Sequence, residues 1–182
     1  MIIKRLFDLF FSLLLVITLC PVLIVGCVLA SIDTLSNGIF TQKRIGQYGV
    51  PFTIYKLKTI RPKTKKISSI GKLLRKSKID ELPQLFNVLF GTMSFVGPRP
   101  DLPGYYDKLE GEFKKNLELK PGITCEASIK YTDEEIILEK EENPLQYNDE
   151  VIFPDKVKMN LEYYHKQSFW LDIKILFRTI VR

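Results

Sequence analysis

The feature that most constrains this chain is an uncharged stretch of 24 residues, Leu9 to Ile32, near its start. As one straight α-helix it would be about 36 Å long, against roughly 30 Å for the hydrocarbon core of a bilayer. A cleaved signal peptide is the alternative, but the stretch is longer than the usual apolar part of such a peptide, and no small-x-small cleavage pattern precedes Asp33. The sequence therefore predicts a membrane segment.

Pro21 lies in the middle of this segment. It removes one backbone N–H group, and its ring collides with the carbonyl group of Ile17, so we expect the helix to break there. Each half then has about 12 residues and a length of roughly 18 Å, which is enough to reach the middle of the bilayer and turn back. The freed backbone groups need partners, which Thr18 or the folded domain can supply.

Basic residues flank the segment on both sides. Lys4 and Arg5 come before it, and twelve Lys and Arg residues with no acidic residue occupy positions 34–79. Because basic flanks remain in the cytoplasm, we favour a re-entrant helix-break-helix over residues 1–33 with both ends cytoplasmic. A kinked single span is the alternative. Both arrangements place residues 34–182 on the cytoplasmic side, as one domain.

The basic zone at 34–79 would attract anionic lipid, nucleotide or nucleic acid with little discrimination. Nucleic acid is disfavoured as a partner because the membrane segment holds this zone at the bilayer. The three cysteines show no paired spacing, so the sequence predicts neither a disulfide framework nor a zinc site.

The remainder predicts an α+β domain that is mainly α. Residues 39–58 alternate in part between apolar and polar positions around the glycines at 46 and 49, which indicates a small β-hairpin. Helices are expected over the basic residues 67–79 and the acidic residues 133–143.

A further helix is expected at the C-terminal end, from Ser168 onward, with Ser168 as its cap. Its predicted apolar face is opposed by the polar residues Asp172, Lys174, Arg178 and Arg182. The apolar face consists of Phe169, Ile173, Leu176, Phe177 and Ile180. With Trp170 near its start, this helix suits either the membrane interface or packing on the domain core.

Two adjacent carboxylates, Asp80 and Glu81, open the segment "DELPQLFNVLFG" directly after the basic zone. The apolar spacing, with Pro83 in a first turn and Gly91 at the end, predicts a helix over residues 81–90. Asp80 would then be its N-cap, and Glu81 would suit the positive end of the helix dipole. The same N–H groups can instead hold phosphate oxygens and lower the carboxylate pKa. Spacing alone leaves both interpretations open.

Arg99 is fixed between two prolines in "GPRP". A short-tethered guanidinium of this kind is a candidate phosphate clamp, and a plain surface loop is the alternative.

The segment "DELPQLFNVLFGTMSFVGPRP", with "FTQKRIG" and "IYKLKT" before it and "KPGIT" after it, resembles the bacterial sugar transferase family. These are small monotopic phosphoglycosyl transferases that begin glycan assembly on a polyprenol carrier, and the resemblance covers essentially the whole chain. The break in the family's re-entrant helix often contains Ser-Pro, and here it contains Cys20-Pro21.

The resemblance implies transfer of a sugar 1-phosphate from a UDP-sugar to undecaprenyl phosphate, with release of UMP and with Mg²⁺ as cofactor. Asp80 would be the nucleophile that forms a covalent phosphosugar intermediate, and Glu81 would help hold the metal or receive a proton, so both are implied metal ligands. The implied phosphate-binding residues are Arg75 and Arg99, with Lys56 and Lys58 as weaker candidates.

The resemblance also implies a location on the cytoplasmic face of the bacterial inner membrane, contacts with anionic lipids, and downstream glycosyltransferases as further partners. The chain departs from many relatives at Cys125 and Glu126, which replace a Gly-Trp pair after "PGIT", and this change puts the local turn and the sugar pocket in doubt. Two alternatives remain: a catalytically inactive membrane scaffold, and a basic membrane-surface binding protein.

Overall fold

The computed structural model describes residues 2–181, which form two compact units. The first unit takes the chain up to Arg44 together with Pro51–Met93, and the second takes Ile45–Val50 and the chain from Ser94 onward. The expected division at residues 33 and 34, between a membrane segment and a cytoplasmic domain, stays a prediction.

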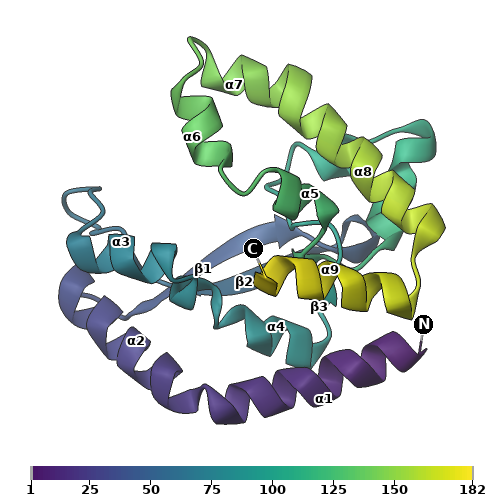
Figure 1. The fold of residues 1–182 in the computed structure, drawn as a ribbon. Coiled ribbons are helices and arrows are strands. Elements are labelled where there is room, and N and C mark those ends of the chain that lie inside the picture. Colours follow the sequence, from purple (N-terminus) through teal and green to yellow (C-terminus); the bar gives the residue numbers. More distant parts are fainter. Residues whose placement is uncertain (1, 182) are drawn as a thin grey trace. The chain divides into compact units, whose positions relative to one another are not determined.

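The first unit begins with α1 (Ile2–Thr18) and α2 (Cys20–Thr34), which are bent by 64° at Leu19 (Figure 1). The predicted break next to Pro21 is confirmed. The hydroxyl of Thr18 donates to the carbonyl oxygen of Leu14 at 2.9 Å, so it folds back on its own helix. Among residues 2–181, no single helix has the length and hydropathy to cross a bilayer, but α1 and α2 meet those criteria together as a bent pair.

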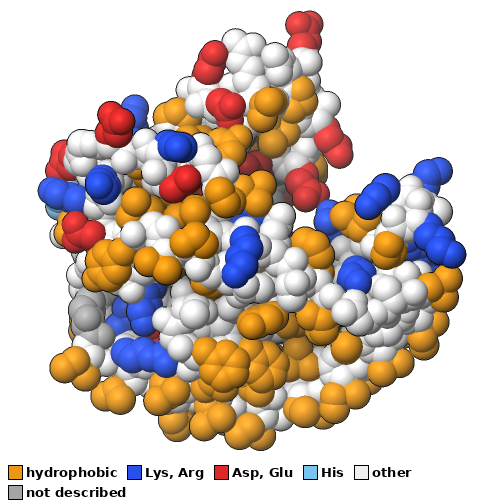
Figure 2. Space-filling view, turned by 180° about the vertical axis from the view of Figure 1, so that it is seen from behind, with side chains coloured by type: hydrophobic (Ala, Val, Ile, Leu, Met, Phe, Trp, Pro, Cys, Tyr) orange, Lys and Arg blue, Asp and Glu red, His pale blue; other side chains and the backbone are white. Residues whose placement is uncertain are grey.

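Large apolar side chains cover the outer face of α1 and α2, where Figure 2 shows them as an almost continuous hydrophobic border. More than half of the side-chain surface is exposed at Ile2, Ile3, Leu6, Phe10, Ile17, Ile24, Val25, Val28 and Ile32. A helix in water buries such residues, so this face is suited to lipid.

The predicted hairpin is confirmed as β1 (Ile39–Ile45) and β2 (Pro51–Leu57), joined by a 3₁₀ turn, η1 (Gln47–Gly49). The predicted basic helix is α3 (Ser69–Lys76), shorter at both ends than expected, and its N-cap Ser68 accepts a hydrogen bond from the backbone N–H of Gly71 at 2.9 Å. Ala30, Leu57 and Leu74 form the buried core that joins α2, β2 and α3.

The helix predicted over 81–90 begins later. The carboxylates lie in a separate 3₁₀ turn, η2 (Ile79–Glu81), and α4 (Gln84–Phe90) follows it. The separation arises because Lys78 has a left-handed backbone, with φ 57°, which turns the chain after α3, and because Pro83 starts the next helix as its N-cap. The predicted helix end at Gly91 is confirmed, with φ 83°.

Arg5 of α1 holds the carboxyl end of α4. Its guanidinium donates to the carbonyl oxygens of Val88 at 2.7 Å and Leu89 at 2.9 Å. The last carbonyl groups of a helix lack partners within the helix, so Arg5 both caps α4 and fixes α1 beneath it.

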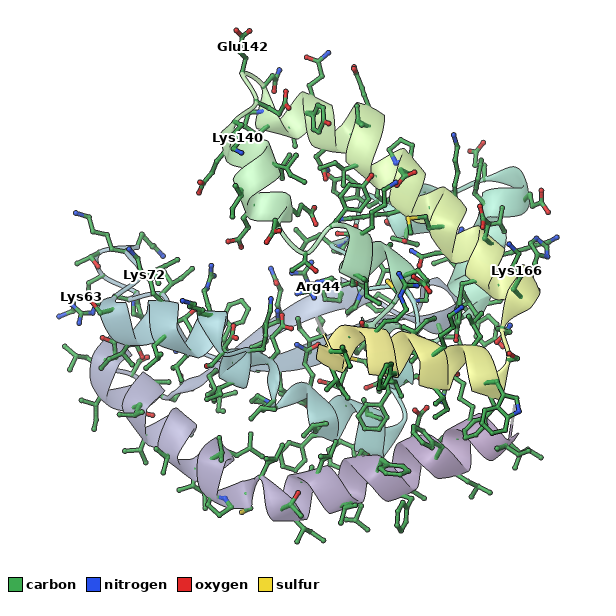
Figure 3. All side chains as sticks on the ribbon, viewed as in Figure 1. Arg44, Lys63, Lys72, Lys140, Glu142 and Lys166 are labelled. Carbon is green, nitrogen blue, oxygen red and sulfur yellow. The ribbon has the colours of Figure 1, made fainter. Side chains whose placement is uncertain are left out.

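The second unit contains a parallel pair of short strands, β3 (Ser94–Val96) and β4 (Gly122–Thr124), which the sequence did not predict. Its helices are η3 (Tyr106–Lys108), η4 (Gly111–Glu118), α5 (Glu126–Lys130), α6 (Glu134–Glu139), α7 (Pro144–Tyr147), η5 (Asn148–Ile152), α8 (Phe153–Lys166) and α9 (Phe169–Val181). Its main buried cluster comprises Ile45, Tyr106, Leu117 and Val157. The acidic helix expected at 133–143 is confirmed in part as α6, and Figure 3 labels Lys140 and Glu142 between α6 and α7.

The predicted faces of α9 are wrong in one respect, and Arg182 of the predicted polar face lies outside the described residues. Asp172, placed on the polar face, is 4% exposed and its carboxylate accepts a hydrogen bond from the hydroxyl of Tyr163, whereas Phe177 and Ile180 are exposed. The buried tyrosine supplies the partner that allows the carboxylate to face inward. The expected cap is confirmed, because Ser168 Oγ accepts from the N–H of Leu171 at 3.2 Å.

Candidate functional site

Asp80 is the buried member of the carboxylate pair. It is 8% exposed, and its Oδ1 is buried without a hydrogen-bond partner among residues 2–181. The prediction that Asp80 is the N-cap of the following helix is therefore wrong, since it sits in η2 and bonds no N–H group of α4. A structural cap does not explain this residue.

The electrostatic prediction for Asp80 is also reversed. Burial, and then the neighbouring charge of Glu81, raise the pKa of the Asp80 carboxyl, while the cations Lys56, Arg75 and Lys78 lower the same pKa by a smaller amount. The predicted depression assumed that N–H groups would bond the carboxylate, and the turn provides none. A buried carboxylate with an unbonded oxygen is a stronger nucleophile than a hydrated one.

Glu81 lies beside Asp80 and is held by Lys56 of β2. Lys56 Nζ is 2.7 Å from Glu81 Oε1, and both side chains are largely buried. The structure thus brings Lys56 to the carboxylate pair, as part of an ion pair.

Arg75 comes from the last turn of α3, and its charge acts on Asp80. Its Nε donates to the hydroxyl of Thr59 at 3.1 Å. The first unit therefore gathers Asp80, Glu81, Lys56 and Arg75 from η2, β2 and α3.

Of the other two expected phosphate-binding residues, Lys58 belongs to the first unit and Arg99 to the second. Lys58 Nζ donates to Ser36 Oγ at 3.0 Å and Asn37 Oδ1 at 2.6 Å, which ties the end of β2 to the segment after α2. Arg99 is an exposed residue of the second unit, in the loop that follows β3. In that loop, the carbonyl oxygen of Pro98 accepts from the N–H of Gly122 at 2.8 Å.

Sequence reasoning missed Asn87, which is 2% exposed. Its amide donates to the carbonyl oxygen of Thr53 at 2.7 Å and accepts from the N–H of Tyr55 at 3.2 Å, so α4 is bonded to β2 as a strand would be. A single amide among the apolar residues of "QLFNVLF" was the available signal, because a buried Asn requires partners.

Gly26 of α2 was also missed. A Cβ atom there would lie 2.8 Å from Leu57 Cδ1 and 3.3 Å from Ile79 Cγ2. Ile79 directly precedes Asp80, so α2 packs against the turn that carries the carboxylates.

Cys125 is buried, and its Sγ accepts from the N–H of Ser128 at 3.3 Å as the N-cap of α5. The thiol therefore caps the start of α5. Its place in this chain is structural.

The carboxylate pair fits Mg²⁺ in a limited way. Mg²⁺ is commonly bound by one or two carboxylates, with substrate phosphates and waters as the remaining ligands. The unbonded Oδ1 of Asp80 and the adjacent Glu81 offer such a partial set, and no group of three or more His, Cys, Asp or Glu side chains converges within residues 2–181. The residues present fit a metal that the substrate helps to hold.

Comparison with known proteins gives a consistent result. The family model described as "Bacterial sugar transferase" matches residues 1–182. The chain is 36% identical to a UDP-glucose:undecaprenyl-phosphate glucose-1-phosphate transferase of Klebsiella pneumoniae, over 100% of this chain and 40% of that protein. It is 33% identical to the galactosyl transferase CpsE of Streptococcus agalactiae, over 78% of this chain and 33% of that protein.

A third relative has a more similar length. The uncharacterized sugar transferase EpsL of Bacillus subtilis is 33% identical over 99% of this chain and 86% of that protein. The chain thus spans about two fifths of the Klebsiella relative and most of the Bacillus relative.

Proposed function

This chain belongs to the bacterial sugar transferase family, and on that premise we propose that it transfers a sugar 1-phosphate from a UDP-sugar to undecaprenyl phosphate and releases UMP. The observation that carries the proposal is the buried Asp80 carboxylate with its unbonded Oδ1, placed beside Glu81, Lys56 and Arg75. Relatives named as undecaprenyl-phosphate glucose-1-phosphate transferases support the substrate class.

In the first step, the Asp80 carboxylate attacks the phosphorus atom that bears the sugar. A bond forms between the Asp80 oxygen and phosphorus, the bond from phosphorus to the bridging oxygen breaks, and UMP leaves with that oxygen and its electrons. In the second step, a phosphate oxygen of undecaprenyl phosphate attacks the same phosphorus and restores the carboxylate. The raised pKa of Asp80 supports its role, because basicity and nucleophilicity rise together.

The basic residues around Asp80 offset the negative charges of the nucleophile and the donor. Arg75 and Lys56 reduce the repulsion between the anionic nucleophile and the anionic donor. Glu81 is held beside Asp80 by its ion pair with Lys56. Its negative charge offsets part of the effect that the positive charges of Lys56 and Arg75 have on the Asp80 carboxylate. Mg²⁺, held by Asp80, Glu81 and the donor's phosphates, would neutralise charge on the pyrophosphate and on the leaving UMP.

We also propose that α1 and α2 form a re-entrant hairpin in the cytoplasmic leaflet of the bacterial inner membrane. The exposed apolar face of both helices supports this placement.

On α9 of the second unit, Trp170, Phe177 and Ile180 are exposed, which suits a helix lying in the interface. Exposed lysines such as Lys63 and Lys72, labelled in Figure 3, would meet anionic lipid headgroups. Downstream glycosyltransferases would receive the lipid-linked product.

The experiment measures UMP release by the full chain in nanodiscs, with Mg²⁺, undecaprenyl phosphate and a panel of UDP-sugars, for the wild type beside Asp80→Asn. We expect release with one or two donors, complete loss in the variant, and loss of wild-type release in excess EDTA. Folded wild type that releases no UMP from any donor would favour the inactive scaffold. Undiminished turnover in EDTA would remove Mg²⁺ from the mechanism.

A further inference from the structure

Thr59 is a buried polar residue two positions after the end of β2, with 6% of its surface exposed. Its hydroxyl accepts the hydrogen bond from Arg75 Nε at 3.1 Å. Its carbonyl oxygen would lie 2.5 Å from a Cβ atom at Gly71. Positions 71 and 75 are one turn apart on α3, so the helix rests directly on Thr59 at Gly71 and reaches it again through the arginine side chain.

We propose that Thr59 is a positioning residue, which fixes the guanidinium of Arg75 in the orientation that binds the donor's phosphates beside Asp80. The inference rests on the proposed function, because it takes phosphate binding as the role of Arg75. The proposed reaction assigns no role to Thr59 itself.

The geometry of the guanidinium explains why one hydrogen bond can matter. The group is planar and has five N–H donors in a fixed fork, and a fork of two donors matches two phosphate oxygens. A bond at Nε fixes the rotation of the plane about the side-chain axis. Thr59 thus contributes to the direction of the terminal nitrogens.

Packing alone does not require the hydroxyl. Valine has nearly the same shape as threonine, and an apolar side chain suits a buried position such as this one. The acceptor oxygen is the one feature that valine lacks. Since the charge of Arg75 acts on the Asp80 carboxylate, a guanidinium that rotates away would change both phosphate binding and the field at the nucleophile.

A double-mutant cycle separates this role from a contribution to folding. Thr59→Val, Arg75→Ala and the double variant are compared with the wild type by kcat and KM for the UDP-sugar that the donor panel identifies. Thr59→Ser keeps the acceptor, and Thr64→Val, at an exposed position before α3, is the matched control. The same cycle, measured calorimetrically with Mg²⁺ and UDP, gives a readout without turnover.

We expect Thr59→Val to lower kcat/KM by about tenfold to a hundredfold, the range of a hydrogen bond to a charged group. Thr59→Ser should remain within about threefold of the wild type, and Thr64→Val should match the wild type. With Arg75 replaced by Ala, Thr59→Val should change kcat/KM and UDP affinity by less than about twofold, because its effect passes through Arg75.

Three results would overturn the inference. Equal losses from Thr59→Val with and without Arg75 would show a structural role. Wild-type kinetics and UDP affinity in Thr59→Val would show that the hydroxyl does not orient the guanidinium. Unchanged kinetics and affinity in Arg75→Ala would remove the arginine from phosphate binding, while turnover by the wild type would leave the proposed function intact.

Discussion

Lys56 Nζ lies 2.7 Å from Glu81 Oε1, and this ion pair sits next to the buried carboxylate of Asp80. Its two members act on Asp80 in opposite directions. Glu81 raises the pKa of the Asp80 carboxyl, and Lys56 lowers it. Burial is the largest cause of the raised pKa of Asp80, and the two members of the pair adjust that pKa in opposite directions.

This relationship predicts two opposite changes in the pH profile. The reactive form of Asp80 is the ionised carboxylate, so kcat/KM should fall as the pH drops through its pKa. Lys56→Gln removes a cation that favours ionisation, so the acid limb of the profile should move to higher pH. Glu81→Gln removes a repelling anion, so that limb should move to lower pH. If the acid limbs of the two variants move in the same direction, the account is contradicted, whatever the maximal rates of the variants.

Asp80→Asn should stabilise the protein while it abolishes transfer. Because burial raises the pKa of Asp80 in the folded state, the ionised carboxylate destabilises the fold above that pKa, and the cost disappears as the pH falls through it. At neutral pH we expect a higher Tm for the variant, by about 2–4 °C per kcal/mol gained. Thermal unfolding at neutral and acid pH checks this prediction. A Tm below that of the wild type at neutral pH would argue against an ionised, poorly solvated Asp80.

Gly26→Ala should impair both stability and activity. The new methyl group would lie 2.8 Å from Leu57 Cδ1 in the core beside Ile79, and overpacking of this kind costs about 1–3 kcal/mol. Adding Leu57→Val removes the Cδ1 atom and should restore much of the lost activity, and Leu57→Val alone is the control. Thermal unfolding and UMP release measure the two effects. If Leu57→Val does not restore activity, the contact between the new methyl group and Leu57 is not the cause of the loss.

Arg5→Met should destabilise the first unit. It removes both hydrogen bonds to the carbonyl oxygens at the end of α4, those of Val88 and Leu89, while it keeps an apolar side chain. We expect a loss of about 1–3 kcal/mol in the free energy of unfolding, measured by denaturant titration in detergent. Arg5→Lys can make only part of the cap, so its loss should be smaller. Equal losses for both variants would contradict this expectation, because they would mean that the positive charge kept by lysine contributes nothing and that lysine forms no part of the cap.

The re-entrant arrangement predicts where the start of α1 lies. In a variant without the native cysteines, a cysteine at position 2 should resist a membrane-impermeant thiol reagent in intact cells, because both ends of the bent pair are cytoplasmic. The same cysteine should react after the cells are opened. Labelling in intact cells would instead support a kinked single span.

Much of the first unit follows from local sequence rules. Pro21 predicted the helix break, the alternation at 39–58 predicted the β1–β2 hairpin, and Gly91 predicted the end of α4. These features depend on residues close in sequence. The parallel strands β3 and β4 depend on pairing Ser94 with Gly122, across 28 positions, and each strand has only three residues, which is too short for a periodic signal.

The candidate site shows the same limit. The motif located Asp80 and Glu81, but the N-cap interpretation failed because the left-handed backbone of Lys78 moves the carboxylates into their own turn. The backbone conformation of one residue thus decides whether the Asp80 carboxylate receives hydrogen bonds from N–H groups. Without those bonds, burial raises the pKa of Asp80 instead of the bonds lowering it. The roles of Asn87 and Thr59 arise from contacts between elements, which spacing along one element does not reveal.

The most direct test of the central claim is mass spectrometry of the protein after brief exposure to Mg²⁺ and the UDP-sugar donor without undecaprenyl phosphate. The account predicts up to one equivalent of UMP per enzyme, and an added sugar-phosphate mass on the peptide that contains Asp80, which undecaprenyl phosphate then removes. It also predicts no adduct in Asp80→Asn. An active wild type that releases UMP only when the acceptor is present, and never carries the adduct, would contradict a covalent route through Asp80.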